Sequence, residues 1–100
     1  MEIKKIQDGI KVVLSLSGRL DTTHAPQLQG VLIPVFDEAQ VVELDFTELE
    51  YVSSAGLRVL LLGEKTAKMK DVSMTLVNVS EDIMEVFEMV GFLDILKIKD

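Results

Sequence analysis

The sequence predicts an α/β domain in which a mixed β-sheet of four to five strands packs against about three to four helices. The 100 residues suit one domain, expected over 1–100. Apolar residues make up 48% of the chain, as in ordinary globular domains. Segments with the two-residue period of strands alternate with segments of helical period, in the order β-β-α-β-α-β-α and then a short final strand. Such alternation is typical of helices layered on a sheet.

The first two strands are expected at 3–7 and 10–16, joined as a hairpin. Asp8-Gly9 separates them, and this dipeptide between apolar runs is a strong hairpin signal because both residues tolerate positive φ. In the second run Val12, Leu14 and Leu16 alternate with more polar residues. This strand should therefore have one buried side.

A polar loop over 17–26 leads into the first helix. Thr22 or Thr23 is expected to cap this helix, and Pro26 fits its first turn. Apolar residues then recur at spacings of three and four, which predicts a helix over about 24–38. Pro34 removes one helical hydrogen bond, so we expect a kink near 30–34 within a single helix.

The next strand is expected at 41–46, and the polar residues at 47–50 predict a turn. Ser53 or Ser54 should cap a second helix that runs to about 70. The first half of that helix is almost wholly apolar and should be buried. Its second half, which begins with Glu64, is charged and should be exposed.

The last third of the chain predicts a strand at 72–78, a third helix and a short strand at 95–98. Ser80 is a helix cap, and acidic residues follow it in the first turn, where the helix dipole favours them. Gly91 stands where a left-handed C-terminal cap is expected. The apolar stripe of this helix consists of Ile83, Val86, Phe87 and Val90.

Composition excludes several functions. The formal charge of −7 gives no cationic field for nucleic acid. The absence of cysteine excludes disulfides and thiolate metal sites, and no apolar run approaches the length of a membrane span. No signal-peptide pattern is present, so we expect a cytoplasmic protein. No glycine-rich phosphate loop occurs, and the carboxylates of 81–88 suit a solvated helix face, so no cofactor or metal is expected.

The candidate site is the turn Ser53-Ser54-Ala55-Gly56, between a strand and an apolar helix. A hydroxyl at the positive end of a helix suits capping, anion binding or phosphorylation. A serine hydrolase would need Ser54 as nucleophile and His24, the single histidine, as base. Val52 replaces the leading glycine of the usual nucleophile elbow, and we therefore expect no enzyme.

Two segments resemble the signature of the STAS family, the anti-sigma factor antagonists. The first is Asp45-Phe46-Thr47, then Leu49, then the run from Tyr51 to Leu57. The second is Gly18-Arg19-Leu20-Asp21, followed by Thr23, Ala25 and Pro26. The resemblance covers the whole chain and implies a STAS-like fold.

The resemblance also implies a partner switch. Ser54 matches the family's phosphoacceptor, while Ser53 stands in place of an aspartate and is the second candidate; Ala55 stands in place of a Ser or Thr. The unphosphorylated domain is expected to bind an anti-sigma factor that is a serine kinase, which frees the sigma factor. Phosphorylation then releases the domain, and a serine phosphatase resets it.

The expected partner surface combines the loop before the first helix with the serine turn. Gly56 is expected to let a partner's backbone approach closely. The alternative is a constitutive STAS adaptor that binds a transporter ATPase or a scaffold complex without phosphorylation. The residues assigned to this surface are Asp21, Thr22, Thr23, His24, Ser53, Ser54, Ala55, Gly56 and Arg58.

Overall fold

The computed structural model describes residues 1–99, and the predicted α/β architecture is confirmed: five strands and three helices occur in that range. No helix within it is long and apolar enough to cross a membrane. The elements in chain order are β1 (Glu2–Asp8), β2 (Lys11–Leu20), α1 (Ala25–Val35), β3 (Val41–Val52), α2 (Ser54–Met69), β4 (Ser73–Val77), α3 (Glu81–Met89) and β5 (Lys97–Lys99).

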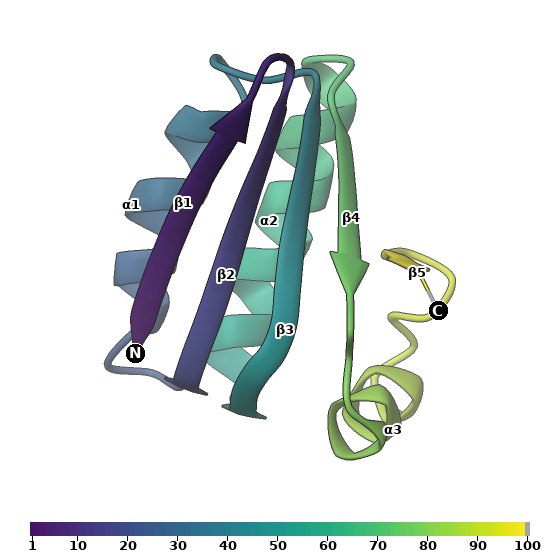
Figure 1. The fold of residues 1–100 in the computed structure, drawn as a ribbon. Helices are drawn as coiled ribbons and strands as arrows, with labels where there is room; N and C mark the ends of the chain where they lie inside the picture. Colours follow the sequence, from purple (N-terminus) through teal and green to yellow (C-terminus); the bar gives the residue numbers. More distant parts are fainter. Residues whose placement is uncertain (100) are drawn as a thin grey trace.

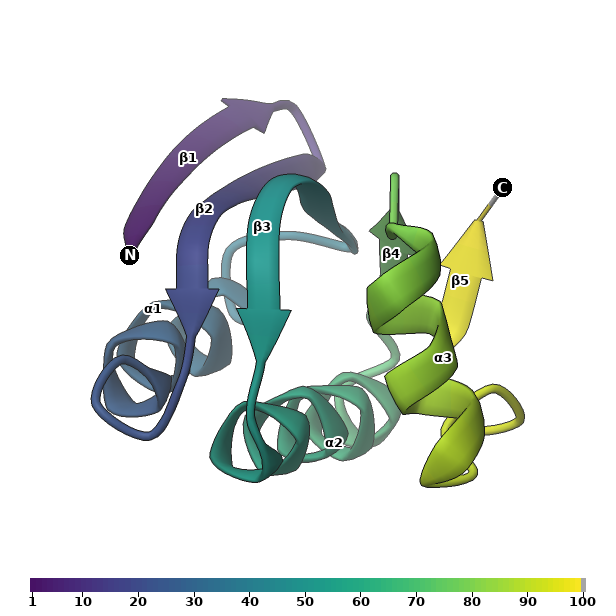
Figure 2. The same cartoon turned by 90° about the horizontal axis from the view of Figure 1, so that it is seen from below.

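The five strands form one mixed sheet in sequence order, β1-β2-β3-β4-β5 (Figure 1). β1 pairs with β2 antiparallel, and every other neighbouring pair is parallel. Each parallel connection passes through a helix, as parallel neighbours require. Because β2 and β3 are parallel, their carboxyl ends meet at one edge of the sheet, where α1 and α2 begin (Figure 2).

One face of the sheet holds the core. α1 and α2 lie together on that face, and the opposite face of β1, β2 and β3 carries no helix among residues 1–99 (Figure 2). On the central strands the side chains of the covered face are buried; Leu14, Leu44 and Leu76 are fully buried and pair across β2, β3 and β4. α3 lies beside β4 and β5 (Figure 2), and its Phe87 packs on Phe46 of β3 with ring centroids 6.3 Å apart.

The predicted hairpin is present, but its loop lies one residue later than expected. Asp8 still pairs with Lys11, so the loop is Gly9-Ile10. Gly9 alone has a positive φ, 60°, which a type II′ turn requires at its first loop position.

The predicted turn at 47–50 is wrong, because β3 continues through these residues to Val52. Their polarity reflects exposure rather than a change of direction: Leu49 and Val52 are still buried. The register with β2 shifts between the pairs Ser15–Asp45 and Ser17–Glu48, as at a β-bulge.

Two expectations for the first helix need correction. His24 is its N-cap residue, and neither Thr22 nor Thr23 caps it; both threonines are exposed. The helix ends at Val35, three residues earlier than predicted. Pro34 lies in its last turn and has no N–H to donate to the Gly30 carbonyl four residues back, and the helix ends one residue later.

The prediction for the second helix is wrong at two positions: Leu62, in the half expected to be buried, is 39% exposed, and Glu64 is buried. Glu64 was expected on an exposed charged half, yet its residue surface is 2% exposed. It lies four residues after Leu60 and three before Ala67, both buried, so it shares their face of α2. The predicted exposure of Lys65, Lys68 and Lys70 is confirmed.

The capping of the third helix is as predicted. The Ser80 hydroxyl accepts a hydrogen bond from the Ile83 backbone N–H at 3.3 Å. Gly91 follows the helix with φ 77°, in the left-handed region. Ile83 and Phe87 are buried, whereas Val90 is 47% exposed. The predicted apolar stripe is therefore not buried at its last residue.

Candidate functional site

The candidate site lies at the sheet edge where β2 and β3 end. Leu20 and Val52 are the last paired residues of the two strands. The Ser53 backbone N–H donates to the Leu20 carbonyl at 2.9 Å, so the serine turn is attached to the loop that follows β2. The structure thus brings together the two segments that the sequence placed on one surface.

The two serines have different roles at the start of α2. Ser53 is the N-cap residue, with extended φ and ψ of −89° and 174°. Its side-chain oxygen accepts from the Gly56 N–H at 3.2 Å, and its carbonyl accepts from Leu57 at 2.9 Å. Ser54 is the first helical residue and is exposed; within residues 1–99 its hydroxyl makes no hydrogen bond to a side chain or backbone. Ser54 is therefore the accessible hydroxyl.

Gly56 explains how closely the turn approaches β2. A Cβ placed on it would lie 2.7 Å from the Leu20 Cγ atom and 2.8 Å from the Leu20 carbonyl oxygen. Gly56 is also buried. The expectation that it admits a partner's backbone is thus corrected: Leu20 of the same chain fills that space.

The loop between β2 and α1 is organised by Asp21. Its Oδ1 atom accepts from the His24 backbone N–H at 3.0 Å and lies 2.8 Å from His24 Nδ1. Desolvation acts to raise the pKa of Asp21, but the hydrogen bonds and charge of His24, helped by Arg19, outweigh it and hold the pKa below its usual value. Within the described chain, the His24 ring pairs with Asp21 and has no hydrogen bond to Ser53 or Ser54.

The remaining expected surface residues flank these two segments. Thr22 and Thr23 are exposed beside Asp21, and Ala55 is half-buried in the first turn of α2. Arg58 is exposed one helical turn after Ser54, so both lie on the same side of the helix.

One pair at this edge was missed by the sequence analysis. The guanidinium carbon of Arg19 lies 4.1 Å from the centroid of the Tyr51 ring, and the two residues are partners across the parallel ladder. With β3 expected to end at Phe46, nothing in the sequence placed Tyr51 opposite β2. The available signal was apolar: Leu49 and Val52 follow Phe46 at spacings of three, which is compatible with a strand that continues through a bulge.

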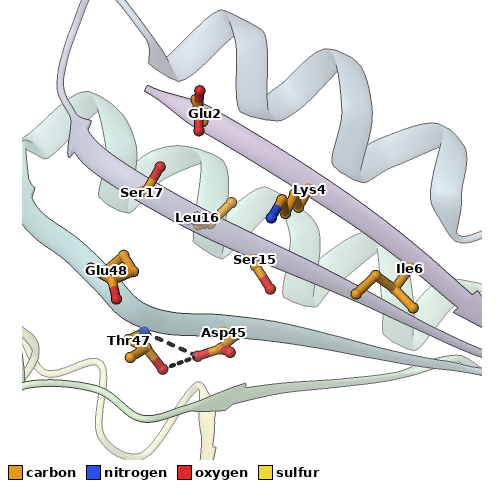
Figure 3. A pocket seen from close by; sticks show the side chains of 9 residues that line it. All are labelled: Glu2, Lys4, Ile6, Ser15, Leu16, Ser17, Asp45, Thr47 and Glu48. Atoms are coloured by element: carbon orange, nitrogen blue, oxygen red, sulfur yellow. Dashed lines mark hydrogen bonds between the residues drawn. The ribbon is translucent and has the colours of Figure 1, made fainter.

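A concave surface separate from the serine turn lies on the uncovered face of the sheet (Figure 3). It encloses about 470 Å³ between β1, β2 and β3. At its rim Asp45 Oδ1 accepts from the Thr47 N–H at 3.0 Å, from its hydroxyl at 2.6 Å and from Asn78 at 3.1 Å. Desolvation acts to raise the pKa of Asp45, but these hydrogen bonds outweigh it and lower the pKa. Asp45 therefore fixes the bulge in β3 and joins it to the end of β4.

Fold and site define a class: a small α/β domain with an accessible serine at a helix start on the carboxyl edge of its sheet. The chain belongs to the STAS domain family, whose model matches residues 3–100. It is 36% identical, over 91% of its length and 78% of the relative, to BtrV of Bordetella bronchiseptica, which is named as a candidate anti-sigma factor antagonist. It is 28% identical, over 98% of its length and 88% of the relative, to the anti-sigma-B factor antagonist of Bacillus subtilis.

Solved structures agree on the fold. The unphosphorylated anti-sigma factor antagonist SpoIIAA matches with a TM-score of 0.82 at 18% identity, over 99% of this chain and 89% of that one. The phosphorylated form of Bacillus SpoIIAA matches with a TM-score of 0.76, over 99% of this chain and 92% of that one. The STAS-like fold implied by the sequence is thereby confirmed.

Proposed function

We propose that this chain is an anti-sigma factor antagonist that works as a phosphorylation-controlled partner switch in the cytoplasm. In its unphosphorylated form it binds an anti-sigma factor that is also a serine kinase, and the sigma factor is freed. Phosphorylation of Ser54 releases the kinase, and a serine phosphatase restores the binding form. The names of the relatives support the antagonist role.

The proposal depends on the different roles of the two serines at the start of α2. Ser53 uses its hydroxyl as a cap, whereas the exposed Ser54 hydroxyl has no structural bond to lose on modification. A kinase can therefore modify Ser54 without uncapping α2. This feature favours Ser54 over Ser53 as the acceptor.

The start of α2 also suits a phosphate. The first turn of α2 carries no acidic residue, whereas Glu81 and Asp82 occupy the first turn of α3. A phosphoserine adds about −1.5 to −2 charge and would be stabilised by the free N–H groups and the dipole of the helix. The modification should change the contact surface and leave the fold intact.

Loss of binding follows from the same geometry. Ser54 lies between the Asp21–His24 loop and Arg58, so a doubly charged group there alters the centre of the proposed partner surface. Steric blocking and repulsion of a partner's carboxylates or carbonyl groups would both weaken the complex. Release of the partner would therefore require no refolding of the domain.

The test uses the serine kinase encoded in the same genome, incubated with the chain and ATP, followed by mapping of the phosphate by mass spectrometry. We expect modification at Ser54, its loss in Ser54→Ala, and its retention in Ser80→Ala, a matched change at another helix start. Ser54→Asp should weaken binding about tenfold or more with a nearly unchanged melting curve. A chain that stays unmodified at both Ser53 and Ser54, or that copurifies with a transporter ATPase instead, contradicts the proposal and favours a constitutive adaptor.

A further inference from the structure

The Arg19–Tyr51 pair extends the carboxyl edge of the sheet onto its uncovered face. Leu20 is buried against Gly56 at the start of α2. Because neighbouring residues of a strand point to opposite faces, Arg19 points away from the helices. Arg19 is exposed, and Tyr51 is 40% exposed although it is a large aromatic residue.

The stretch of sequence that contains this pair is poor in basic residues. Between residues 12 and 64 the only lysines or arginines are Arg19 and Arg58, while eight aspartates and glutamates lie in the same range. Within residues 1–99 the Arg19 guanidinium makes no ion pair shorter than 4.0 Å, although its charge contributes to the low pKa of Asp21. Arg19 is thus one of two basic side chains in an otherwise acidic stretch of the sequence, and its guanidinium is not held by an ion pair within the described residues.

We propose that the Arg19–Tyr51 pair is an anchor of the partner contact and that it binds a carboxylate on the partner protein. This inference rests on the proposed function and names chemistry that the serine turn alone does not supply. Stacking on Tyr51 uses one face of the guanidinium and leaves the N–H groups at its edge free for a bidentate bond to a carboxylate. Tyrosine and arginine are also enriched among the residues that dominate binding energies at interfaces.

The location makes the pair accessible to the partner that contacts Ser54. Arg19 immediately precedes Leu20, whose carbonyl accepts from Ser53, and Tyr51 lies two residues before Ser53. A partner that covers Ser54 therefore reaches the pair by extending across the sheet edge. Arg19 and Ser54 approach that edge from opposite faces, which favours a partner carboxylate over a phosphate on Ser54 as the ligand of Arg19.

The experiment measures dissociation constants by calorimetry between the unphosphorylated chain and the kinase that modifies Ser54. Arg19→Glu should weaken binding about tenfold or more, the level of a strong interface residue. Lys65→Glu makes the same charge change on an exposed part of α2, about 16 Å along the helix from Ser54, and should change binding less than threefold. Tyr51→Leu should weaken binding, and Tyr51→Phe, which keeps the ring, should not.

Further measurements distinguish an effect on partner binding from a loss of stability and from a failure of the proposed function. All four variants should melt near the wild-type temperature, and a partner variant with its contacting carboxylate changed to lysine should restore binding to Arg19→Glu. Equal effects of Arg19→Glu and Lys65→Glu overturn the inference even when Ser54 is phosphorylated normally. An Arg19→Glu variant whose unphosphorylated form binds the kinase within threefold of wild type also overturns it.

Discussion

Gly56 offers the sharpest test of how the site is built, through replacement by alanine. In an exposed helix this change stabilises by about 1 kcal/mol, because glycine is a poor helix former. At Gly56 the new methyl group would lie 2.7 Å from Leu20 Cγ and 2.8 Å from the Leu20 carbonyl oxygen. Real Cβ atoms essentially never show contacts under 3.0 Å, so the chain must shift.

The cost can be worked out from these contacts. Overpacking of this kind destabilises by about 1–3 kcal/mol. The backbone oxygen cannot retreat without lengthening the 2.9 Å bond from Ser53 to Leu20, which contributes about 1 kcal/mol. The higher helix propensity of alanine contributes about 1 kcal/mol and offsets the loss of this hydrogen bond. The net expectation is a loss of about 1–3 kcal/mol in the free energy of unfolding.

Gly30 is the matched control, since it lies in α1 and a Cβ placed there meets nothing within 4 Å. Gly30→Ala should therefore stabilise by about 0.4–1 kcal/mol. Urea unfolding followed by circular dichroism gives both values, and each kcal/mol corresponds to about 4–8 °C in melting temperature for a domain of this size. If Gly56→Ala is as stable as Gly30→Ala, the proposed close contact between the serine turn and β2 is incorrect.

Three further predictions use the same measurements. Ser53→Ala should cost about 1 kcal/mol through the lost cap, while Ser54→Ala leaves stability unchanged; equal effects would contradict the division of roles. Glu64→Gln should be neutral or stabilising by about 1 kcal/mol, because Oε1 of Glu64 is buried without a partner and the Lys68 Nζ lies 4.0 Å from Oε2; a large loss would reveal an unrecognised bond. The folded pKa of Asp45 is below its usual 3.8, so its contribution is present above that value and disappears as pH falls through the lowered pKa. In urea titrations the free energy of unfolding of Asp45→Asn should therefore be lower than that of wild type at pH 7, and the difference should disappear only as the pH falls below 3.8 and through the lowered pKa.

The sequence predicted those elements whose signals are local. Alternating burial in β2 and the cap of α3 depend on neighbouring residues, and both are confirmed. The course of β3 after Phe46 depends on distant partners. Its bulge is held in part by the bond between Asp45 and Asn78, which are 33 residues apart. A run of polar residues there looks like a turn until that pairing is known.

At the candidate site, too, the features that depend on the three-dimensional structure could not be predicted from local sequence. The sequence placed the two serines at a helix start but could not say which one caps, because that depends on backbone angles: Ser53 is extended, with ψ 174°. It also could not find the Arg19–Tyr51 pair, since their alignment depends on two register shifts between β2 and β3. Side-chain pairs across a bulged parallel ladder are fixed by the three-dimensional register.

The capping role of Ser53 gives a physical reason why the chain tolerates serine where the STAS signature has aspartate. An N-cap needs an acceptor oxygen, and both side chains supply one at similar strength. The exchange thus keeps the helix start and removes one negative charge beside Ser54. In the proposed switch, a phosphate on Ser54 would face the helix N-terminus without a carboxylate on the preceding residue to repel it. The departure from the signature therefore changes the charge at the start of α2 and preserves the geometry of its cap.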